Sequence, residues 1–411
     1  FPQPLDLCVH RNLCINFILV RVLASMLADH RCCQGRPWTV GDMQLWTSTS
    51  VCHLKRHAAS GLLNGSSVPH SISQMRNCFG FPTLDLPASS KDSGAGSGCT
   101  KSSALEQLVV KCAHCSQNFP VAELLYGFRE GFLPESLAGR FLRLSRDDDT
   151  ELFLESCRSS GLLRALLKDA AAGLLTKRMS LTDANGLLGR GSMFVLSTAQ
   201  ARELLGDRPG GVLLDVGAGD GNVTARLARL FDSVLASESS LSMARSLRQR
   251  GFATLTGENL DGLGVAAEEA GICLGPEESV DCVALLNVLD RCDVPVSLLR
   301  DLRRRLRPGT GRLLLTVVLP FRPFVERGSG RVPPKERLPL DPNASWEASV
   351  TVLWEKVLQP LGFELDVVAR LPYLSEGDAT VPVYALDDGV FVLRSGGEDV
   401  YPLASQVPRA S

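Results

Sequence analysis

The sequence predicts an α/β protein built on a doubly wound, mainly parallel β-sheet. From about residue 120 onward, short apolar segments alternate with amphipathic segments, which is the pattern of successive β-α-β units. One apolar segment, residues 212–216, runs directly into a glycine-rich turn at residues 217–221. The chain has 411 residues, of which 45% are hydrophobic and 21% are charged, so it can bury a large core and bulk disorder is excluded.

The expected elements follow the chain in order. Leucines at three-to-four-residue spacing over residues 149–177 predict amphipathic helices that cover one side of the core. Ser197, followed three residues later by Gln200, predicts the capped start of a further helix. Strands are then expected at 212–216, 233–237, 253–256, 280–286, 311–319, 364–369 and 390–393, and helices at 222–230, 243–250, 295–306 and 346–361. In a sheet of this kind the ligand binds at the carboxyl ends of the strands.

Composition divides the chain into three parts. Residues 1–118 carry scattered Cys and His and a Ser/Gly-rich run, without a sustained helical or strand period, and we expect them to be largely disordered or unrelated to the remainder. Residues 119–396 form the expected domain with its N-terminal helices, and residues 397–411 are an expected disordered tail.

The histidines and cysteines are concentrated near the N-terminus. All six histidines and nine of the thirteen cysteines precede residue 116, so no histidine-dependent catalytic set can be built from the rest of the chain alone. Cys112 and Cys115 have the spacing of half a zinc site, but no matching second pair follows them. We therefore predict no metal site.

Net charge and hydropathy limit the partners. With 43 basic and 45 acidic side chains the formal charge is -2, which disfavours nucleic acid as a partner. The apolar run at residues 15–27 is too short and too interrupted for a membrane span of about 20 apolar residues, so no transmembrane segment is expected.

The glycine-rich turn is the strongest local signal for a ligand. Its glycines Gly217, Gly219 and Gly221 allow a ligand to approach the backbone closely. Their Gly-x-Gly-x-Gly spacing differs from the dinucleotide pattern, whose helix N-terminus holds a pyrophosphate. The flanking acids Asp215 and Asp220 would repel a phosphate but suit a cationic amino-acid group.

A further acid, Glu238, closes the next expected strand, 23 residues after Asp215. That position suits a carboxylate that binds both hydroxyl groups of a ribose. A nicotinamide nucleotide would use the same carboxylate, so Glu238 alone does not choose the ligand. Together with the acids of the turn it favours S-adenosylmethionine, whose sulfonium and ammonium groups are positive.

Six separated blocks of the chain resemble the DREV methyltransferase family, in the same order, from about residue 120 to 395. The first block, Asn185 to Phe194, contains Gly-Arg-Gly-Ser, and the second is the glycine-rich turn. The others are Leu286 to Asp293, Val318 to Phe321, Leu371 to Leu374 followed by Glu376 to Asp378, and Leu386 to Asp388 followed by Val390 to Leu393. Residues 261–278 look like an insertion relative to the family.

The resemblance implies a class I, Rossmann-like methyltransferase that uses S-adenosylmethionine. The implied acceptor is the Nδ1 (pros) nitrogen of histidine in proteins or peptides with His-x-His tracts that have a small middle residue. The implied cofactor-binding residues are Arg190, Ser192, Asp215, Gly217, Gly219 and Glu238. The family is associated with endomembranes, so the endoplasmic reticulum or another endomembrane is the expected location, with the cytoplasm as the alternative.

The resemblance also implies a histidine pocket formed by Asn287, Asp290 and Tyr384. Val383 precedes Tyr384, where a second tyrosine is usual in the family, so the pocket wall differs there. In such a pocket Asn287 or Asp290 would accept the Nε2–H of the ring and leave Nδ1 free for the methyl group.

Each of these assignments has an alternative. Asn287 and Asp290 would also serve as caps for the helix expected near residue 295, and Tyr384 as a half-buried core aromatic. Arg190 would then be an exposed loop residue. For the whole protein, the alternatives are a methyltransferase with another acceptor and a non-catalytic scaffold that binds the cofactor.

Overall fold

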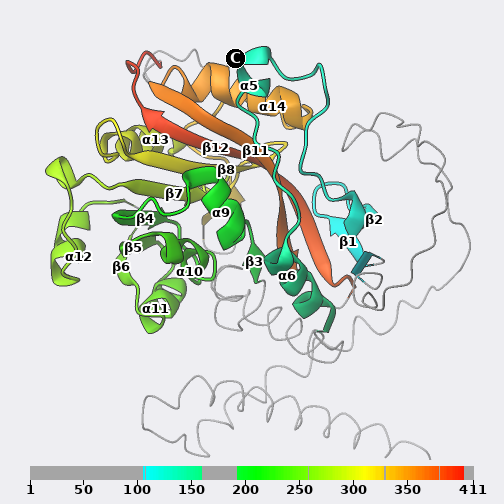
Figure 1. The fold of residues 1–411 in the computed structure, drawn as a ribbon, viewed down its shortest axis with the longest axis horizontal. Helices are drawn as coiled ribbons and strands as arrows, with labels where there is room; N and C mark the ends of the chain where they lie inside the picture. Colours follow the sequence, from blue (N-terminus) through cyan, green and yellow to red (C-terminus); the bar gives the residue numbers. More distant parts are fainter. Residues whose placement is uncertain are drawn as a thin grey trace, which may run out of the picture. The chain divides into compact units, whose positions relative to one another are not determined.

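A computed structural model describes residues 105–106, 108–159, 192–257, 259–327, 330–378 and 380–401. The chain divides into two compact units after Gln74, and every described residue belongs to the second, Met75–Ser411. In this unit one twisted sheet has helices on both faces (Figure 1). None of its described helices is long and apolar enough to cross a membrane.

The centre of the sheet is parallel, as predicted. The strand β4 (Val212–Val216) pairs in parallel with β5 (Ser233–Glu238) and with β7 (Cys282–Leu286). Outside them β6 (Ala253–Thr256) pairs with β5, and β8 (Arg312–Leu319) pairs with β7. The residues of β4 are all buried, because both faces of the strand are covered by helices.

Two long antiparallel strands complete this part of the sheet. The strand β12 (Val383–Ser395) pairs with β8 on one side and with β11 (Phe363–Glu376) on the other. Both extend well beyond the segments predicted at 364–369 and 390–393. Charged residues such as Arg370 and Asp387 interrupt the apolar pattern of these strands, although both are buried.

The sheet begins before the boundary that the sequence predicts at residue 119. The strand β1 (Val109–Cys112) pairs in parallel with the start of β12, and β2 (Asn118–Pro120) pairs with β1. The predicted boundary at residue 119 therefore falls inside the sheet, within the region that the sequence predicts to be largely disordered or unrelated to the remainder. His114 lies in the turn between β1 and β2, so the folded unit does contain a histidine.

Helices pack on the two faces of the sheet over separate hydrophobic clusters. One cluster includes Leu204 of α9 (Thr198–Leu205) and Leu227 of α10 (Thr224–Leu227). The other includes Leu299 of α13 (Pro295–Arg304) and Val350 of α14 (Trp346–Leu353). The capping box predicted for Ser197 and Gln200 is confirmed at the start of α9. The remaining elements are η1 (Val121–Glu123), α5 (Glu135–Ala138), α6 (Asp148–Ser159), β3 (Met193–Phe194), η2 (Ala228–Leu230), α11 (Leu241–Gln249), α12 (Leu263–Glu269), η3 (Pro276–Glu278), β9 (Val325–Arg327), β10 (Gly330–Val332) and the π-helical turn η4 (Trp354–Leu358).

Two further expected segments can be compared with the structure. The helix α6 confirms the start of the helical cover predicted over 149–177, and residues 160–177 lie outside the described residues. The stretch 261–278, which resembles an insertion, contains α12, whose Leu263 and Ala267 are buried.

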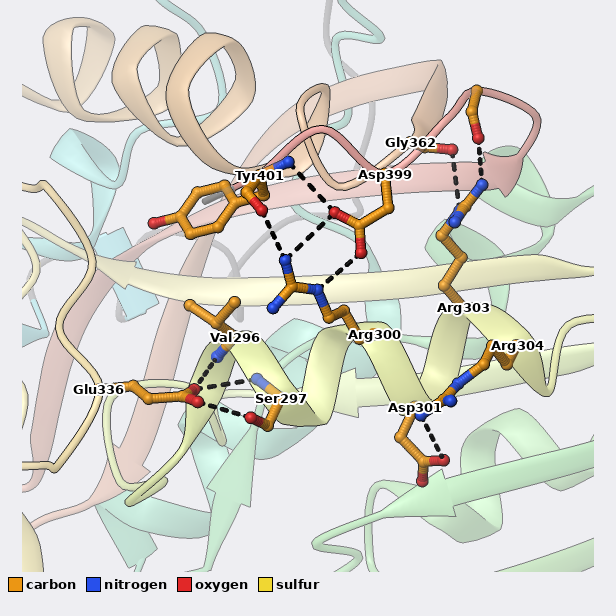
Figure 2. A network of polar contacts seen from close by, with 11 residues as sticks. Val296, Ser297, Arg300, Asp301, Arg303, Arg304, Glu336, Gly362, Asp399 and Tyr401 are labelled. Atoms are coloured by element: carbon orange, nitrogen blue, oxygen red, sulfur yellow. Dashed lines mark hydrogen bonds and ion pairs between the residues drawn. The ribbon is translucent and has the colours of Figure 1, made fainter. Parts of the chain in front are cut away.

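Arginine side chains of α13 form hydrogen bonds with residues near the end of the described chain (Figure 2). Arg300 donates to the carboxylate of Asp399 at 2.6 Å and to the carbonyl of Tyr401 at 2.7 Å. Arg303 donates to the carbonyl of Gly362 at 3.0 Å. The expectation of a disordered tail from residue 397 is therefore wrong up to Tyr401, and residues 402–411 lie outside the described residues.

Candidate active site

The glycines of the turn after β4 adopt backbone conformations that residues with a side chain rarely take. Gly217, Gly219 and Gly221 have φ of 72°, 58° and 81°, in the left-handed region that favours glycine. The N–H groups of Gly217 and Ala218 donate to the carbonyl of Ser237 at 2.8 and 3.1 Å. A Cβ atom on Gly217 would lie 2.6 Å from Cγ2 of Val288, so this glycine brings the turn against the loop after β7.

Gly219 differs from Gly217 because it borders open space. Among the described residues no atom lies within 4 Å of the position that its Cβ would take. Its N–H donates to Oε2 of Glu238 at 2.9 Å, and Oε1 of Glu238 accepts from the N–H of Ser240 at 2.8 Å. The hydroxyl of Ser239 also donates to Oε1, at 3.4 Å. Oε2 keeps a second lone pair, so Glu238 can still accept a hydrogen bond from a ligand hydroxyl there.

Asp215 lies beneath the turn. Its side chain is 2% exposed, and Oδ2 accepts a hydrogen bond of 2.6 Å from the hydroxyl of Thr224 at the start of α10. Burial raises the pKa of Asp215 to about 6, although the hydrogen bond from Thr224 lowers it; the charge of Glu238 also raises it. The hydrogen bond joins the strand before the turn to the helix after it. Asp215 therefore supports the conformation of the turn and does not itself line the open space beside Gly219.

Asn287 begins the second part of the site, directly after β7. Its φ is 57°, which is unusual for a residue with a side chain. Its side-chain amide donates to Oδ2 of Asp388 at 2.8 Å and accepts from the hydroxyl of Thr316 at 3.1 Å. The amide is thus held between β8 and β12, and its backbone lies at the same edge of the sheet as the glycine-rich turn.

Two buried carboxyl groups belong to this part of the site: Asp388, which accepts from Asn287, and Asp290, which follows Asn287 by three residues in the loop after β7. Asp290 is 4% exposed, and its Oδ2 forms an ion pair of 2.6 Å with Arg291. Burial raises the pKa of Asp290 to about 6, and Arg291 opposes that shift. Asp388 is fully buried, and burial raises its pKa well above the ordinary value. In both residues Oδ1 is buried and has no hydrogen-bond partner among the residues that the structure describes.

The hydroxyl of Tyr384 is bound by the turn that precedes β12. Its hydroxyl donates to Oδ2 of Asp378 at 2.6 Å, at the turn between β11 and β12. Burial raises the pKa of Asp378, but hydrogen bonds from Thr380 and Tyr384 outweigh it and hold the pKa at about 2. Of the three predicted pocket residues, Asn287 is hydrogen-bonded to Asp388, and the charge of Asp290 raises the pKa of Asp388, whereas the hydroxyl of Tyr384 is bound to Asp378.

Two further residues of this part of the site, Asp388 and Tyr373, were not predicted as site residues from the sequence. Tyr373 of β11 pairs with Leu386 of β12, and its hydroxyl donates to the sulfur of Met193. Burial raises the pKa of Tyr373, and the charges of Asp388 and Asp290 raise it further. Both missed residues belong to blocks that carry the family resemblance, which was the only signal that pointed to them.

The Gly-Arg-Gly-Ser block is described only at its last residue. Ser192 is paired with Glu376 at the end of β11: its carbonyl accepts from the N–H of Glu376 at 2.8 Å, and its N–H donates to the Glu376 carboxylate at 3.4 Å. Arg190, predicted to bind the cofactor, lies outside the described residues.

A buried ionic network supports the other face of β12. Arg370 donates to both carboxylate oxygens of Asp387, at 3.0 and 2.6 Å, and lies 3.8 Å from the carboxylate of Glu347. The indole N–H of Trp346 donates to the backbone carbonyl of Asp388 at 3.2 Å. The backbone of Asp388 is thus held by contacts on the face opposite its side chain.

No group of three or more metal-ligating side chains occurs among the described residues. His114, beside Cys112 and Cys115, is half-buried, and burial lowers its pKa to about 4, assisted by the charge of Arg322.

Comparison with protein families matches residues 126–395 to the DREV methyltransferase family. Solved structures with partial similarity include three chains, all with low TM-scores. A chain from the complex of the Haloferax volcanii Trm112 methyltransferase activator with a methyltransferase is 19% identical over 29% of this chain, with a TM-score of 0.23, and the match spans only 51% of that chain's length. DhpI in complex with SAH is 17% identical, with 49% of this chain and 84% of that chain covered and a TM-score of 0.31. Precorrin-6y C5,15-methyltransferase from Geobacter metallireducens is 14% identical, with 48% and 86% covered and a TM-score of 0.30.

Proposed function

Since the chain belongs to the DREV methyltransferase family, we propose that it transfers a methyl group from S-adenosylmethionine to a histidine side chain of a protein or peptide. Its fold is the class I, Rossmann-like methyltransferase fold, and its methyl donor is S-adenosylmethionine. The histidine acceptor and the roles of individual residues are the proposal. The observation that carries it is the pair of buried carboxyl groups beside Asn287, at the same edge of the sheet as the turn at Gly219.

The turn and Glu238 fit the donor. Gly219 leaves space that any side chain would fill, and Oε2 of Glu238 keeps a free lone pair for one hydroxyl group of a ribose. The other hydroxyl would replace the 3.4 Å contact of Ser239 at Oε1. Glu238 and Gly219 would hold the donor, with Asp215 supporting the turn from below. S-adenosylmethionine supplies an electrophilic methyl carbon on a positively charged sulfur.

Asp290 and Asn287 suit an imidazole acceptor. A neutral imidazole attacks through the nitrogen that carries no proton, so the enzyme selects Nδ1 by holding Nε2–H. The unpartnered Oδ1 of Asp290 is the acceptor we assign to that N–H. When Nδ1 bonds to the methyl carbon, the carbon–sulfur electron pair goes to sulfur and the ring becomes an imidazolium. Asp290 then takes the Nε2 proton, which leaves neutral Nδ1-methylhistidine.

A methylation assay tests the proposal. The chain is incubated with S-adenosylmethionine and a His-Ala-His peptide, and the modified atom is identified by mass spectrometry and NMR. We expect methyl transfer to Nδ1, and none to the peptide in which both histidines are replaced by alanine. Methylation of another side chain would favour a different acceptor, and donor binding without any transfer would favour a cofactor-binding scaffold.

A further inference from the structure

The two carboxyl groups beside Asn287 have different surroundings. Asp290 has a counter-ion, because Arg291 lies 2.6 Å from its Oδ2. Asp388 has none: within the described ranges its side chain receives only the hydrogen bond from Asn287, and no basic side chain comes within ion-pair distance. An ionised carboxylate that is fully buried without a counter-ion is strongly unfavourable, so this environment favours the neutral acid.

The charged groups around Asp388 act in the same direction. Asp290 and Asp387 both place negative charge near it. Of the basic groups of this region, Arg370 of β11 binds Asp387 and Arg291 binds Asp290. His114, on which the charges of Arg322, Asp387 and Arg291 act, also lies in this region, and its pKa is lowered to about 4. The neighbouring β8 contributes only the neutral hydroxyl of Thr316, which donates to Asn287, and β11 contributes the phenol Tyr373, whose hydroxyl donates to Met193.

We propose that Asp388 is a positioning residue that works as a neutral carboxylic acid, while Asp290 is the ionised group that receives the acceptor's proton. Through Oδ2, Asp388 accepts the amide N–H of Asn287, and Thr316 holds the other end of the same amide. The side chain of Asn287 is therefore held between Thr316 of β8 and Asp388 of β12. These two contacts fix the position of Asn287 in the proposed acceptor pocket. A pair of carboxyl groups whose environments differ in this way divides into an acid and a base. This inference rests on the proposed function, because it assigns roles in the same site.

The same substitution, Asp to Asn, should then have a small effect at position 388 and a large one at position 290. In Asp388→Asn the new side chain is neutral, its oxygen can accept from Asn287, and its N–H can replace the acid O–H. In Asp290→Asn the group that takes the proton is lost. If Asp388 were instead the ionised group, Asp388→Asn would be as damaging as Asp290→Asn.

The experiment measures kcat and KM for the His-Ala-His peptide between pH 6 and 9, together with the affinity for S-adenosylhomocysteine by calorimetry. We expect Asp388→Asn to stay within about threefold of the wild type in kcat/KM, and Asp388→Ala to lose about tenfold or more in kcat with unchanged S-adenosylhomocysteine affinity. Asp290→Asn should lose about 100-fold in kcat. Glu269→Gln, at an exposed position of α12, is the matched control and should behave as wild type.

Two results would overturn the inference. One is a loss in Asp388→Asn as large as in Asp290→Asn, and the other is wild-type kinetics in Asp388→Ala. If the wild type methylates no histidine, the proposed function has failed, and the state of Asp388 is then read without turnover. The infrared difference spectrum between wild type and Asp388→Asn at pH 7 should show the carbonyl stretch of a protonated carboxyl group. A carboxylate band in its place refutes the neutral state whatever the activity.

Discussion

Glu238, at the end of β5, accepts a hydrogen bond of 2.9 Å from the backbone N–H of Gly219 in the turn after β4. Its other oxygen accepts from the N–H of Ser240, which precedes α11. One carboxylate therefore joins the turn to the next strand and helix while it borders the open space beside Gly219. Under the proposed function, the same side chain shapes the donor site and binds the donor's hydroxyl groups.

Replacement of Glu238 should weaken donor binding in proportion to the hydrogen-bonding capacity that is lost. Charge-assisted hydrogen bonds contribute about 1.5–3 kcal/mol each, so Glu238→Ala should raise the Kd for S-adenosylmethionine by about 10- to 100-fold or more. Glu238→Gln keeps one acceptor oxygen and should fall between Ala and wild type. Calorimetric titration measures both, with Glu269→Gln as the control. Wild-type affinity in Glu238→Ala would show that the donor binds elsewhere.

Alanine at Gly217 and at Gly219 should separate stability from donor binding. Gly217→Ala adds the left-handed strain to a Cβ that meets Val288 at 2.6 Å, so we expect a loss of about 2–3 kcal/mol in the free energy of unfolding. Gly219→Ala meets no described atom and should cost only about 1 kcal/mol. Its Cβ points into the space assigned to the donor, so the Kd for S-adenosylmethionine should rise at least about tenfold.

Urea unfolding and calorimetry check the two variants. Equal stability losses in both variants would contradict the contact with Val288. Unchanged donor affinity in Gly219→Ala would place the donor away from this turn.

The parallel centre of the sheet could be predicted because its strands are buried on both faces and read as continuous apolar runs, as in β4. The extent of β11 and β12 could not. Arg370 and Asp387 look like breaks in an apolar pattern, and only the fold brings Arg370 to Glu347 and Asn287 to Asp388. Such partners are far apart in the sequence, so no local pattern indicates them. The turn at Gly219 could be predicted because its residues are adjacent in the chain, whereas Asp388 was missed because its partner Asn287 is distant in the sequence.

Removal of Arg370 should strongly destabilise the protein. Its guanidinium is 3% exposed and neutralises Asp387 in a bidentate pair beside Glu347, which Arg129 also binds. Because the loss of one partner leaves a buried charge uncompensated, Arg370→Met should lower the free energy of unfolding by about 3–5 kcal/mol. Arg370→Met combined with Asp387→Leu should recover part of that loss, since both charges are then absent. Urea unfolding of the single and double variants measures the difference. If the free energy of unfolding of Arg370→Met lies within about 1 kcal/mol of wild type, the contribution is on the order of that of an exposed ion pair. That result would contradict the assigned burial of Arg370.

The raised pKa of Asp290 predicts opposite pH dependences for stability and activity. Burial raises this pKa from 3.8 to about 6 in the folded state, so folding favours the protonated carboxyl. The stabilising contribution is complete below about pH 4 and is lost as the pH rises through about 6. Asp290→Asn has no charge to bury and should match wild type near pH 4 but exceed it at pH 8 by up to about 3 kcal/mol in the free energy of unfolding.

Activity should follow the reverse course, because the carboxylate that costs stability is the form that takes the acceptor's proton. The wild-type rate should fall as the pH drops through about 6, and the more stable Asp290→Asn should remain slow at every pH. An acceptor histidine also becomes protonated in this range, at a pKa of about 6.5, so the stability measurement is made without peptide. If wild type and Asp290→Asn unfold with the same free energy at pH 4, 6 and 8, the carboxyl of Asp290 is not buried in the manner described.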